Sequence, residues 1–330
     1  MRFALSEEQA ELATTVRALL DRRADSAAVR AASTSETGHD EALWATLCEQ
    51  IGVAALAVPE EYDGVGASFL ETAIVLEELG RSLAPTPLLA TTVAIEALLA
   101  GGTAEAKAHL LPRLAAGEIG TIALDDGPVL DGDRAAVVLA VRGDDLVQVT
   151  GAGAAWTESM DQSIRLARLD LAGAELTVVG DGSAARARAE LVGAAAVAAL
   201  AVGLSERALQ MTLAYLKERV QFGRPIGSFQ ALKHRMADLL ARVEMSRSAS
   251  WAASYALADP ATEPAEAGFL THAATSYAVE TAALAASECV QLHGGIAITW
   301  EHDAHLVFKR AHALGQLFGA PHRHRAAIDL

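Results

Sequence analysis

Aromatic residues and cysteines are scarce in this chain. Phe, Trp and Tyr make up 5% of its 330 residues, whereas alanine is abundant. A composition dominated by small aliphatic residues favours long, closely packed helices over sheets. The two cysteines, Cys48 and Cys289, are too few for a disulfide framework, so we interpret them as buried thiols.

Basic residues are also few. The 26 Lys and Arg stand against 42 Asp and Glu, which gives a formal net charge of −16. Such a charge disfavours nucleic acid or an anionic membrane as a partner. The N-terminus is acidic and amphipathic rather than a signal peptide, and the apolar run at 193–204 is too short to cross a bilayer. We therefore expect a cytoplasmic protein without a membrane segment.

The first 119 residues have the pattern of an all-helical domain. Apolar residues recur every three or four positions between capping and turn residues. Residues 31–39 are polar and are predicted to form a surface loop. The helices are predicted to begin at Ser6 and to lie at about 40–51, 68–80, 88–100 and 103–116.

Residues 120–185 differ in character. Short runs of β-forming residues alternate with Gly and Asp turns, which predicts a small antiparallel β domain. The strands are expected at 121–124, 135–141, 146–150, 163–169 and 176–179.

Residues 186–330 return to helical periodicity. The pattern predicts helices at about 186–221, 228–258, 263–292 and 303–316, which would form an antiparallel four-helix bundle. The expected fold is therefore mainly α with a small β insert. It comprises an N-terminal helical domain (1–119), a reduced β domain (120–185) and a C-terminal bundle (186–330). His302 and His305 lack a third ligand at suitable spacing, so no metal site is predicted.

Two stretches of the last domain carry polar residues that packing does not require. The first runs from Arg219 to Ala237 and reads R-x-x-F-G-x-P-I-x-x-F-Q-x-x-K-x-x-M-A, with Ser228 expected as the N-cap of a helix. The second starts at Gln291 and reads Q-L-H-G-G-I-x-x-T-W-E-H. Together with V-P-E-E-Y-x-G-x-G at 58–66 and E-E-L-G at 77–80, these motifs closely resemble the acyl-CoA dehydrogenase family.

The resemblance implies FAD as the cofactor. Arg219, Phe222 and Gln230 match family positions that reach across a subunit interface to the FAD of a partner. An arginine fork suits a pyrophosphate, an aromatic edge can cover the dinucleotide, and an amide can bind phosphate or ribose oxygens. The positions of the adenine-end site are matched by Gln291, Gly294 and Gly295, where glycines permit close backbone approach and N–H groups bind anions.

The resemblance fails in two places. The β domain is much shorter than is usual in the family, and it lacks the T-E-x-x-A-G-S-D and W-I-T/S segments that hold the flavin. The family also needs a catalytic Glu, which removes the α-proton of the acyl thioester. The two positions where members place it carry Gly193 and Phe318 here. Glu190, one turn before Gly193, would serve only if the helix register shifted.

Three hypotheses follow. In the first, the chain is the shortened, non-catalytic subunit of a heteromeric α2β2 acyl-CoA dehydrogenase, like those of actinobacterial steroid side-chain breakdown. A full-length homologue would then supply the catalytic Glu, with a bulky steroid-derived acyl-CoA as substrate and electron-transferring flavoprotein as acceptor. In the second, the chain forms a homo-oligomeric dehydrogenase that uses Glu190 as its base. In the third, it is a scaffold or binding protein that kept only the fold.

Overall fold

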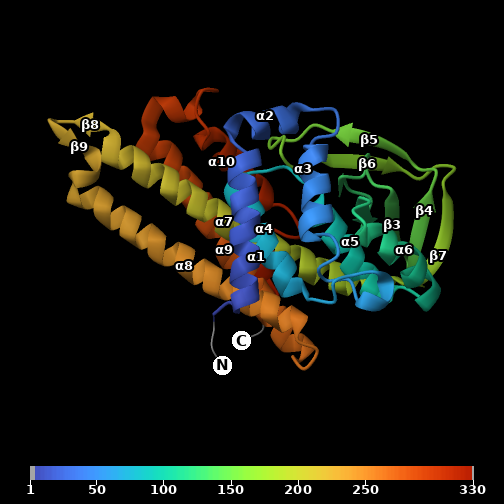
Figure 1. The fold of residues 1–330 in the computed structure, drawn as a ribbon. Coiled ribbons are helices and arrows are strands. Elements are labelled where there is room, and N and C mark those ends of the chain that lie inside the picture. The colour runs from blue at the N-terminus through green and yellow to red at the C-terminus, as the bar shows by residue number, and fades with distance from the viewer. Residues whose placement is uncertain (1–3, 329–330) are drawn as a thin grey trace. The chain divides into compact units, whose positions relative to one another are not determined.

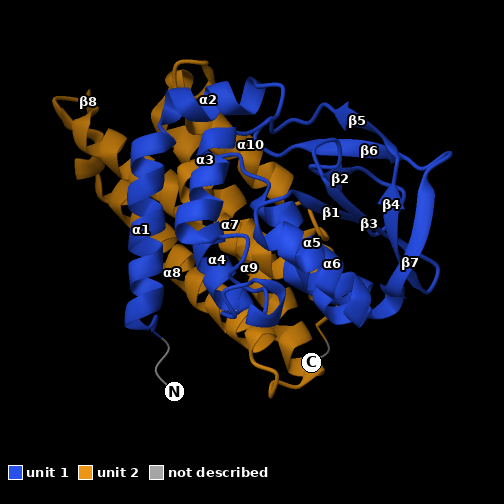
Figure 2. Cartoon of the chain, turned by 45° about the vertical axis from the view of Figure 1, so that its right-hand side comes forward, with its two compact units in different colours: residues 1–76, 84–193 blue, residues 77–83, 194–330 orange. Residues whose placement is uncertain are grey.

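The computed structural model describes residues 4–328 and is mainly helical with small sheets (Figure 1), as the sequence predicts. The chain divides into two compact units (Figure 2). Unit 1 comprises residues 1–76 and 84–193, and unit 2 comprises residues 77–83 and 194–330. This division falls within two helices, so the domain boundaries expected near residues 119 and 185 stay a prediction.

Unit 1 begins with the expected helices. Ser6 starts the first one with a capping box, because its hydroxyl accepts from the Gln9 amide (3.2 Å) while the Gln9 side chain accepts from the Ser6 amide (2.9 Å). The helices are α1 (Glu7–Arg23), α2 (Ser26–Thr34), α3 (Glu41–Thr46) with a π turn (Leu47–Ile51), a 3-10 turn (Glu60–Tyr62), α4 (Phe69–Ser82), α5 (Leu88–Gly101) and α6 (Ala104–Ala115).

The loop predicted at 31–39 was wrong in its first half, because residues 31–34 belong to α2. Asp25 caps this helix by accepting from the Ala28 amide at 2.8 Å. The polar residues that suggested a loop bond back into the helix instead. The Ser33 hydroxyl, for example, donates to the carbonyl of Val29 at 2.7 Å.

Seven strands form two sheets in the β region. The first sheet has the order β1-β3-β4-β7 and the second β2-β6-β5. Their strands are β1 (Gly120–Ala123), β2 (Val129–Leu130), β3 (Val137–Arg142), β4 (Asp145–Thr150), β5 (Gly153–Thr157), β6 (Leu166–Asp170) and β7 (Glu175–Asp181). A shared apolar core contains Ala123 of β1, Val129 of β2 and Val147 of β4.

The prediction of five antiparallel strands was wrong in two respects. It missed β2, which has two residues, and β5, whose sequence Gly-Ala-Ala-Trp-Thr lacks β-branched alternation. In addition, β1 pairs with β3 in parallel, with Gly120 opposite Val137. Between β1 and β3 the chain passes through β2, so that it enters β3 at the same end of the sheet at which it entered β1.

Unit 2 consists mainly of long helices. The chain enters it within α7 (Gly182–Glu218), and α8 (Gln230–Ala258), α10 (Ala304–Leu314) and α11 (Pro321–Ala326) all pack against α9 (Pro264–His293). The helix α11 was not predicted, since it lies in a short His- and Arg-rich tail. By length and composition α7 could cross a membrane, contrary to the sequence reading, but 78% of its most apolar window is buried inside the protein.

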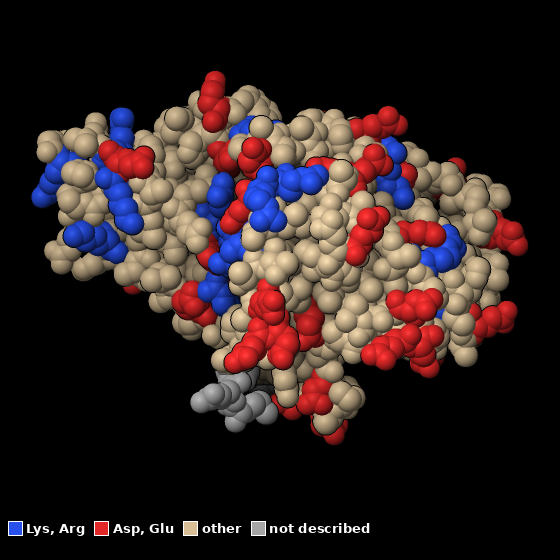
Figure 3. Space-filling view, viewed as in Figure 1, with Lys and Arg blue, Asp and Glu red and all other residues tan. Residues whose placement is uncertain are grey.

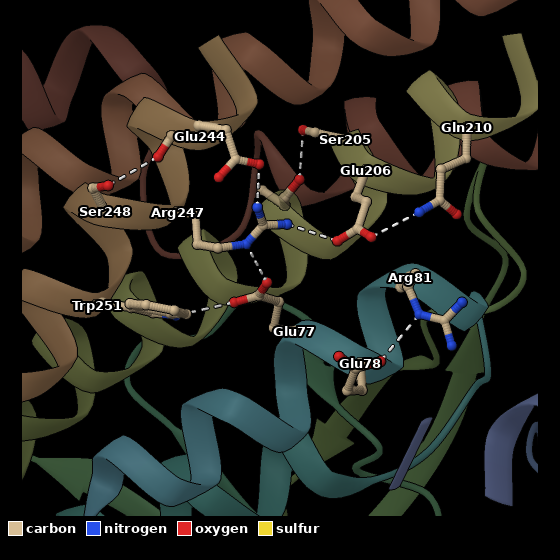
Figure 4. Close-up of polar contacts among 11 residues, drawn as sticks. Glu77, Glu78, Arg81, Ser205, Glu206, Gln210, Glu244, Arg247, Ser248 and Trp251 are labelled. Atoms are coloured by element: carbon tan, nitrogen blue, oxygen red, sulfur yellow. Dashed lines mark hydrogen bonds and ion pairs between the residues drawn. The ribbon is translucent and has the colours of Figure 1, made fainter. Parts of the chain in front are cut away.

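A half-buried arginine joins three elements of unit 2 (Figure 4). The Arg247 guanidinium on α8 contacts Glu77 at the end of α4 (2.8 Å), Glu206 of α7 (2.6 Å) and Glu244 of α8 (2.5 Å). The Trp251 indole N–H also donates to Glu77, at 3.2 Å. Burial raises the pKa of Glu77, and the charge of Arg247 opposes that rise. The three helices are thus tied by one charge network.

The end of α4 also approaches α7 with no side chain between the backbones. A Cβ atom added at Gly203 would overlap the carbonyl oxygen of Glu77, and one added at Gly80 would overlap that of Leu200. Glycine is required at both positions because the two helix backbones touch there.

We expect Gly203→Ala to destabilise the protein by more than about 2 kcal/mol, because the added methyl group forces α4 away from α7. The matched control is Gly268→Ala in α9, where an added Cβ meets nothing within 4 Å. That substitution should be neutral or stabilise by up to about 1 kcal/mol. Urea denaturation of both variants measures the difference, and equal midpoints would contradict the close approach.

Replacing Arg247 by Met should cost about 3–5 kcal/mol, since the carboxylates of Glu77 and Glu206 are left without a counter-ion. The deficit should shrink as the pH falls. Burial holds the folded-state pKa of Glu77 above its unfolded value, so the folded state binds a proton more readily as the pH falls. Thermal melting from about pH 8 to about pH 5 tests this. A deficit that grows toward low pH would exclude a buried, unpaired carboxylate.

Candidate functional site

The two motifs singled out in the sequence meet at one end of unit 2. Arg219 lies just after α7, and its amide donates to the carbonyl of Tyr215 at 2.9 Å. The Tyr215 ring lies 4.4 Å from that of His293, the residue before Gly294. The residue to which the Arg219 amide is bonded, at the end of α7, therefore stacks on a residue of the second motif. Sequence patterns carry no signal for this contact, because its partners are far apart along the chain.

A second contact joins α8 to α9. Arg235, in the second turn of α8, forms an ion pair of 2.5 Å with Glu288 near the end of α9. This ion pair holds the start of α8 beside the end of α9, which Gly294 and Gly295 follow. We call the combined surface at 217–235 and 291–300 the helix-end corner.

The tip of the helix-end corner is a small hairpin of β8 (Val220–Gln221) and β9 (Arg224–Pro225). Its turn residues, Phe222 and Gly223, have φ values of 54° and 77°. Two successive left-handed residues are typical of a tight hairpin turn, but a phenylalanine is unfavourable there. The Phe222 side chain is nevertheless 91% exposed. Such strain at an exposed aromatic residue indicates a functional position.

Arg224 completes the tip. Its guanidinium lies 4.1 Å from the centre of the Phe229 ring, and Phe222 meets the same ring edge-on at 6.1 Å. A 3-10 turn (Ile226–Ser228) then leads into α8. Here the N-cap prediction for Ser228 was wrong: its hydroxyl donates to the carbonyl of Pro225 at 2.7 Å, and α8 begins at Gln230 without a side-chain cap.

The helix-end corner is cationic on an otherwise acidic chain. Figure 3 shows Lys and Arg side chains gathered around the β8–β9 hairpin. The exposed basic residues there are Lys217, Arg219, Arg224, Lys233 and Arg235. Within residues 4–328, the Arg219 side chain has no hydrogen-bond or ion-pair partner. A cationic surface with free guanidinium donors suits an anionic ligand such as a phosphate.

The glycine segment offers open backbone. Gly294 ends α9 with φ 68° and ψ −145°, a conformation that only glycine adopts readily. A Cβ atom added at Gly294 or Gly295 would meet nothing within 4 Å, so a ligand can approach the backbone there. Gln291 and Gln230 are both exposed beside these features. Three of the predicted positions, Gln291, Gly294 and Gly295, thus present open polar groups, whereas the Gln230 amide nitrogen lies 3.4 Å from His234 Nε2.

Two aromatic features of this surface were missed by sequence reasoning. Trp300 is 66% exposed, and the Lys309 ammonium lies 4.7 Å above its ring. His293 is buried between Tyr215 and His302, with ring centres 4.4 Å and 4.5 Å away. Burial lowers the pKa of His293, which favours a neutral ring that supports the segment.

The positions expected for a catalytic acid carry none. Gly193 lies within α7, and Phe318 has a left-handed backbone with φ 52°. Glu190 is exposed on α7 and pairs with Arg186 one turn earlier, at 3.5 Å. Proton abstraction from an acyl thioester needs a carboxylate held against the substrate in a dry pocket, and Glu190 is exposed to solvent instead. The described part of the chain also has no group of three His, Cys, Asp or Glu side chains that could hold a metal.

The chain matches two family profiles. Residues 6–118 match the acyl-CoA dehydrogenase N-terminal domain, and residues 180–329 match the acyl-CoA dehydrogenase C-terminal domain. Among similar proteins is the acyl-CoA dehydrogenase IpdE2 of Mycobacterium tuberculosis, which is 47% identical over 318 residues, covering 96% of this chain and 94% of the relative. The acyl-CoA dehydrogenase FadE34 of the same organism is 33% identical, over 83% of this chain and 40% of its own length.

Solved structures with the same fold include a chain of a steroid enzyme and a chain of a two-protein complex. A chain of the Tcur3481–Tcur3483 steroid acyl-CoA dehydrogenase has a TM-score of 0.86 and 30% identity, covering 98% of this chain and 96% of that one. A chain of the ChsE4–ChsE5 complex from Mycobacterium tuberculosis has a TM-score of 0.88 and 25% identity, covering 99% and 98%.

Proposed function

Because this chain belongs to the acyl-CoA dehydrogenase family, we propose that it is a subunit that contributes FAD contacts in trans to a catalytic partner. Family members depend on FAD, which accepts the hydride when an acyl-CoA thioester is oxidised between its α and β carbons. The catalytic Glu and the flavin-ring contacts would come from a full-length homologue in an α2β2 assembly.

The observation that carries this proposal is the exposure of the cofactor positions. Arg219, Phe222 and Gln230 project from the helix-end corner, and Phe222 is 91% exposed. The residues fit the cofactor chemically, because free guanidinium groups and open glycine backbone suit a pyrophosphate. They face outward, so the FAD they would hold belongs to another subunit.

The absence of a base supports the same proposal. By the resemblance, Gly193 and Phe318 stand where family members carry the catalytic Glu, and neither is a carboxylate. Glu190, the substitute in the homo-oligomeric alternative, is exposed and paired with Arg186. A chain with cofactor contacts but no base is incomplete as an oxidoreductase, so we infer that it is inactive without its partner.

The relatives guide the finer parts of the proposal. The two-chain names of the Tcur3481–Tcur3483 steroid enzyme and the ChsE4–ChsE5 complex favour a heteromer and, for the former, a steroid substrate. We therefore propose a bulky steroid-derived acyl-CoA as substrate, electron-transferring flavoprotein as acceptor and the cytoplasm as location. The scaffold alternative, in which the chain binds neither FAD nor a catalytic partner, is separated by the experiments below.

Purified alone, the chain should be colourless, and co-expression with a full-length homologue should give a yellow, active complex. The flavin-to-protein ratio by absorbance and acyl-CoA oxidation with an artificial electron acceptor are the measurements. Yellow, active protein from this chain alone would favour the homo-oligomeric alternative. Failure of every homologue tested to bind it or to restore flavin would favour the scaffold alternative.

Within that complex, Arg219→Ala should weaken FAD retention about 10- to 100-fold, the range expected for losing charge-assisted hydrogen bonds. The matched control is Arg22→Ala, which removes an exposed arginine at the end of α1. Flavin release during dilution, followed by fluorescence, gives the affinity of each variant. Equal retention in the two variants would exclude Arg219 from the cofactor site.

Glu190→Gln in the same complex should leave kcat within about twofold of the unmodified value, because a general base typically contributes about 10²–10⁴-fold and Glu190 is not that base. Steady-state kinetics measures this. A fall of about a hundredfold or more with unchanged flavin content would instead make Glu190 the base.

A further inference from the structure

The strand β5 is an edge that nothing in the described structure covers. It lies last in the order β2-β6-β5 and pairs only with β6 (Figure 1). Four of its five residues are exposed, and within residues 4–328 no backbone hydrogen bond reaches its outer side. An edge of this kind presents a row of unpaired N–H and C=O groups.

The last residues of β7, an edge strand of the first sheet, show how a neighbouring segment can protect an edge. The Thr103 amide donates to the Val179 carbonyl of β7 at 2.8 Å, and Gly102 bridges Gly180. By contrast, β5 reads Gly-Ala-Ala-Trp-Thr and has no charge, no proline and no covering segment. Charged residues, prolines and covering segments normally prevent an edge strand from pairing with another chain.

The inward face of β5 is apolar. In this pairing register Trp156 lies opposite Ala167 and Ala154 lies opposite Leu169. Directly opposed residues share a face of the sheet, and Ala167 is fully buried. Trp156 therefore stands on the core side of the sheet, yet its side chain is 54% exposed. Among residues 4–328, no strand pairs with the outer side of β5.

We propose that β5 is a docking edge for an extended segment of another polypeptide, which would add a fourth strand to the β2-β6-β5 sheet. Main-chain hydrogen bonds along the edge would supply affinity, and an apolar side chain against Trp156 would supply specificity. An acyl chain could cover Trp156 but would leave the backbone groups unpaired.

Charge defines the kind of segment that fits. Glu158 follows β5 directly, and Asp170 lies opposite Gly153 at the other end of the strand; both side chains are exposed. A segment with Lys or Arg near each end and apolar residues at alternate positions would complement this edge. A second copy of the chain fits less well. Antiparallel pairing of two β5 strands would bring Glu158 of one copy near Asp170 of the other.

The test uses the full chain and a synthetic peptide, Lys-Thr-Val-Thr-Val-Thr-Lys. We expect the peptide to slow amide hydrogen exchange in residues 153–157 by about tenfold or more at saturation. The peptide control is Lys-Thr-Val-Pro-Val-Thr-Lys, which lacks a central N–H and should bind at least about tenfold more weakly. No protection of β5, or equal binding of both peptides, would overturn the proposal.

A matched pair of variants tests the face of the strand. Trp156→Lys places a charge on the core side, whereas Ala155→Lys places the same charge on the opposite side of the same strand. Peptide affinity, measured by fluorescence anisotropy, should fall about tenfold or more for the first and less than about threefold for the second. Equal losses would show that added charge alone is responsible, which contradicts strand addition.

Sedimentation measurements test whether a second copy of the chain occupies the β5 edge instead. Self-association of the unmodified chain that is abolished by Trp156→Lys but not by Ala155→Lys would assign the edge to a second copy, and the proposal would then be wrong. A chain that remains monomeric at the concentrations used for exchange, while its β5 is protected by the peptide, supports the heterologous segment.

Discussion

The contact between the end of α4 and the middle of α7 is the constraint on which unit 2 depends. Gly80 and Gly203 let the two backbones touch, and Arg247 then ties Glu77 of α4 to Glu206 of α7. The guanidinium also contacts Glu244 of α8, and its charge lowers the cost of burying Glu77, the one buried carboxylate of the three. Residues 77–83 are therefore part of unit 2 although the rest of α4 belongs to unit 1.

A helix held in its middle can carry a strained feature at its end. The helix α7 spans 37 residues and ends one residue before Arg219. The adjoining ends of α8 and α9 are joined by Arg235 and Glu288. Functional groups at helix ends gain from this arrangement, because rigid elements position them while their backbone stays open to a ligand. The hairpin at Phe222 can thus keep a costly backbone without loosening the bundle.

The sequence predicted long elements well and short ones poorly. The helices α7, α8 and α9 carry many turns of apolar periodicity, so their signal is strong. The strands β2 and β5 and the helix α11 are too short for periodicity, and α8 has no side-chain cap to mark its start. In the helix-end corner the motif positions were found by resemblance. The stacks of Arg224 on Phe229, Lys309 on Trp300 and Tyr215 on His293 depend on backbone geometry or on partners distant in sequence.

The two exposed surfaces share a thermodynamic argument. Leaving a phenylalanine in water forgoes about 1.5–3 kcal/mol of burial, and a left-handed backbone costs about 1–3 kcal/mol more, so Phe222 is unfavourable twice over in the free chain. At β5 the unpaired edge and the half-exposed Trp156 carry a similar penalty. The surfaces differ in charge, since the helix-end corner is basic and the ends of β5 are acidic. One partner group cannot satisfy both, so the ligands proposed for the two surfaces differ: an anionic cofactor for the first and a basic-ended strand for the second.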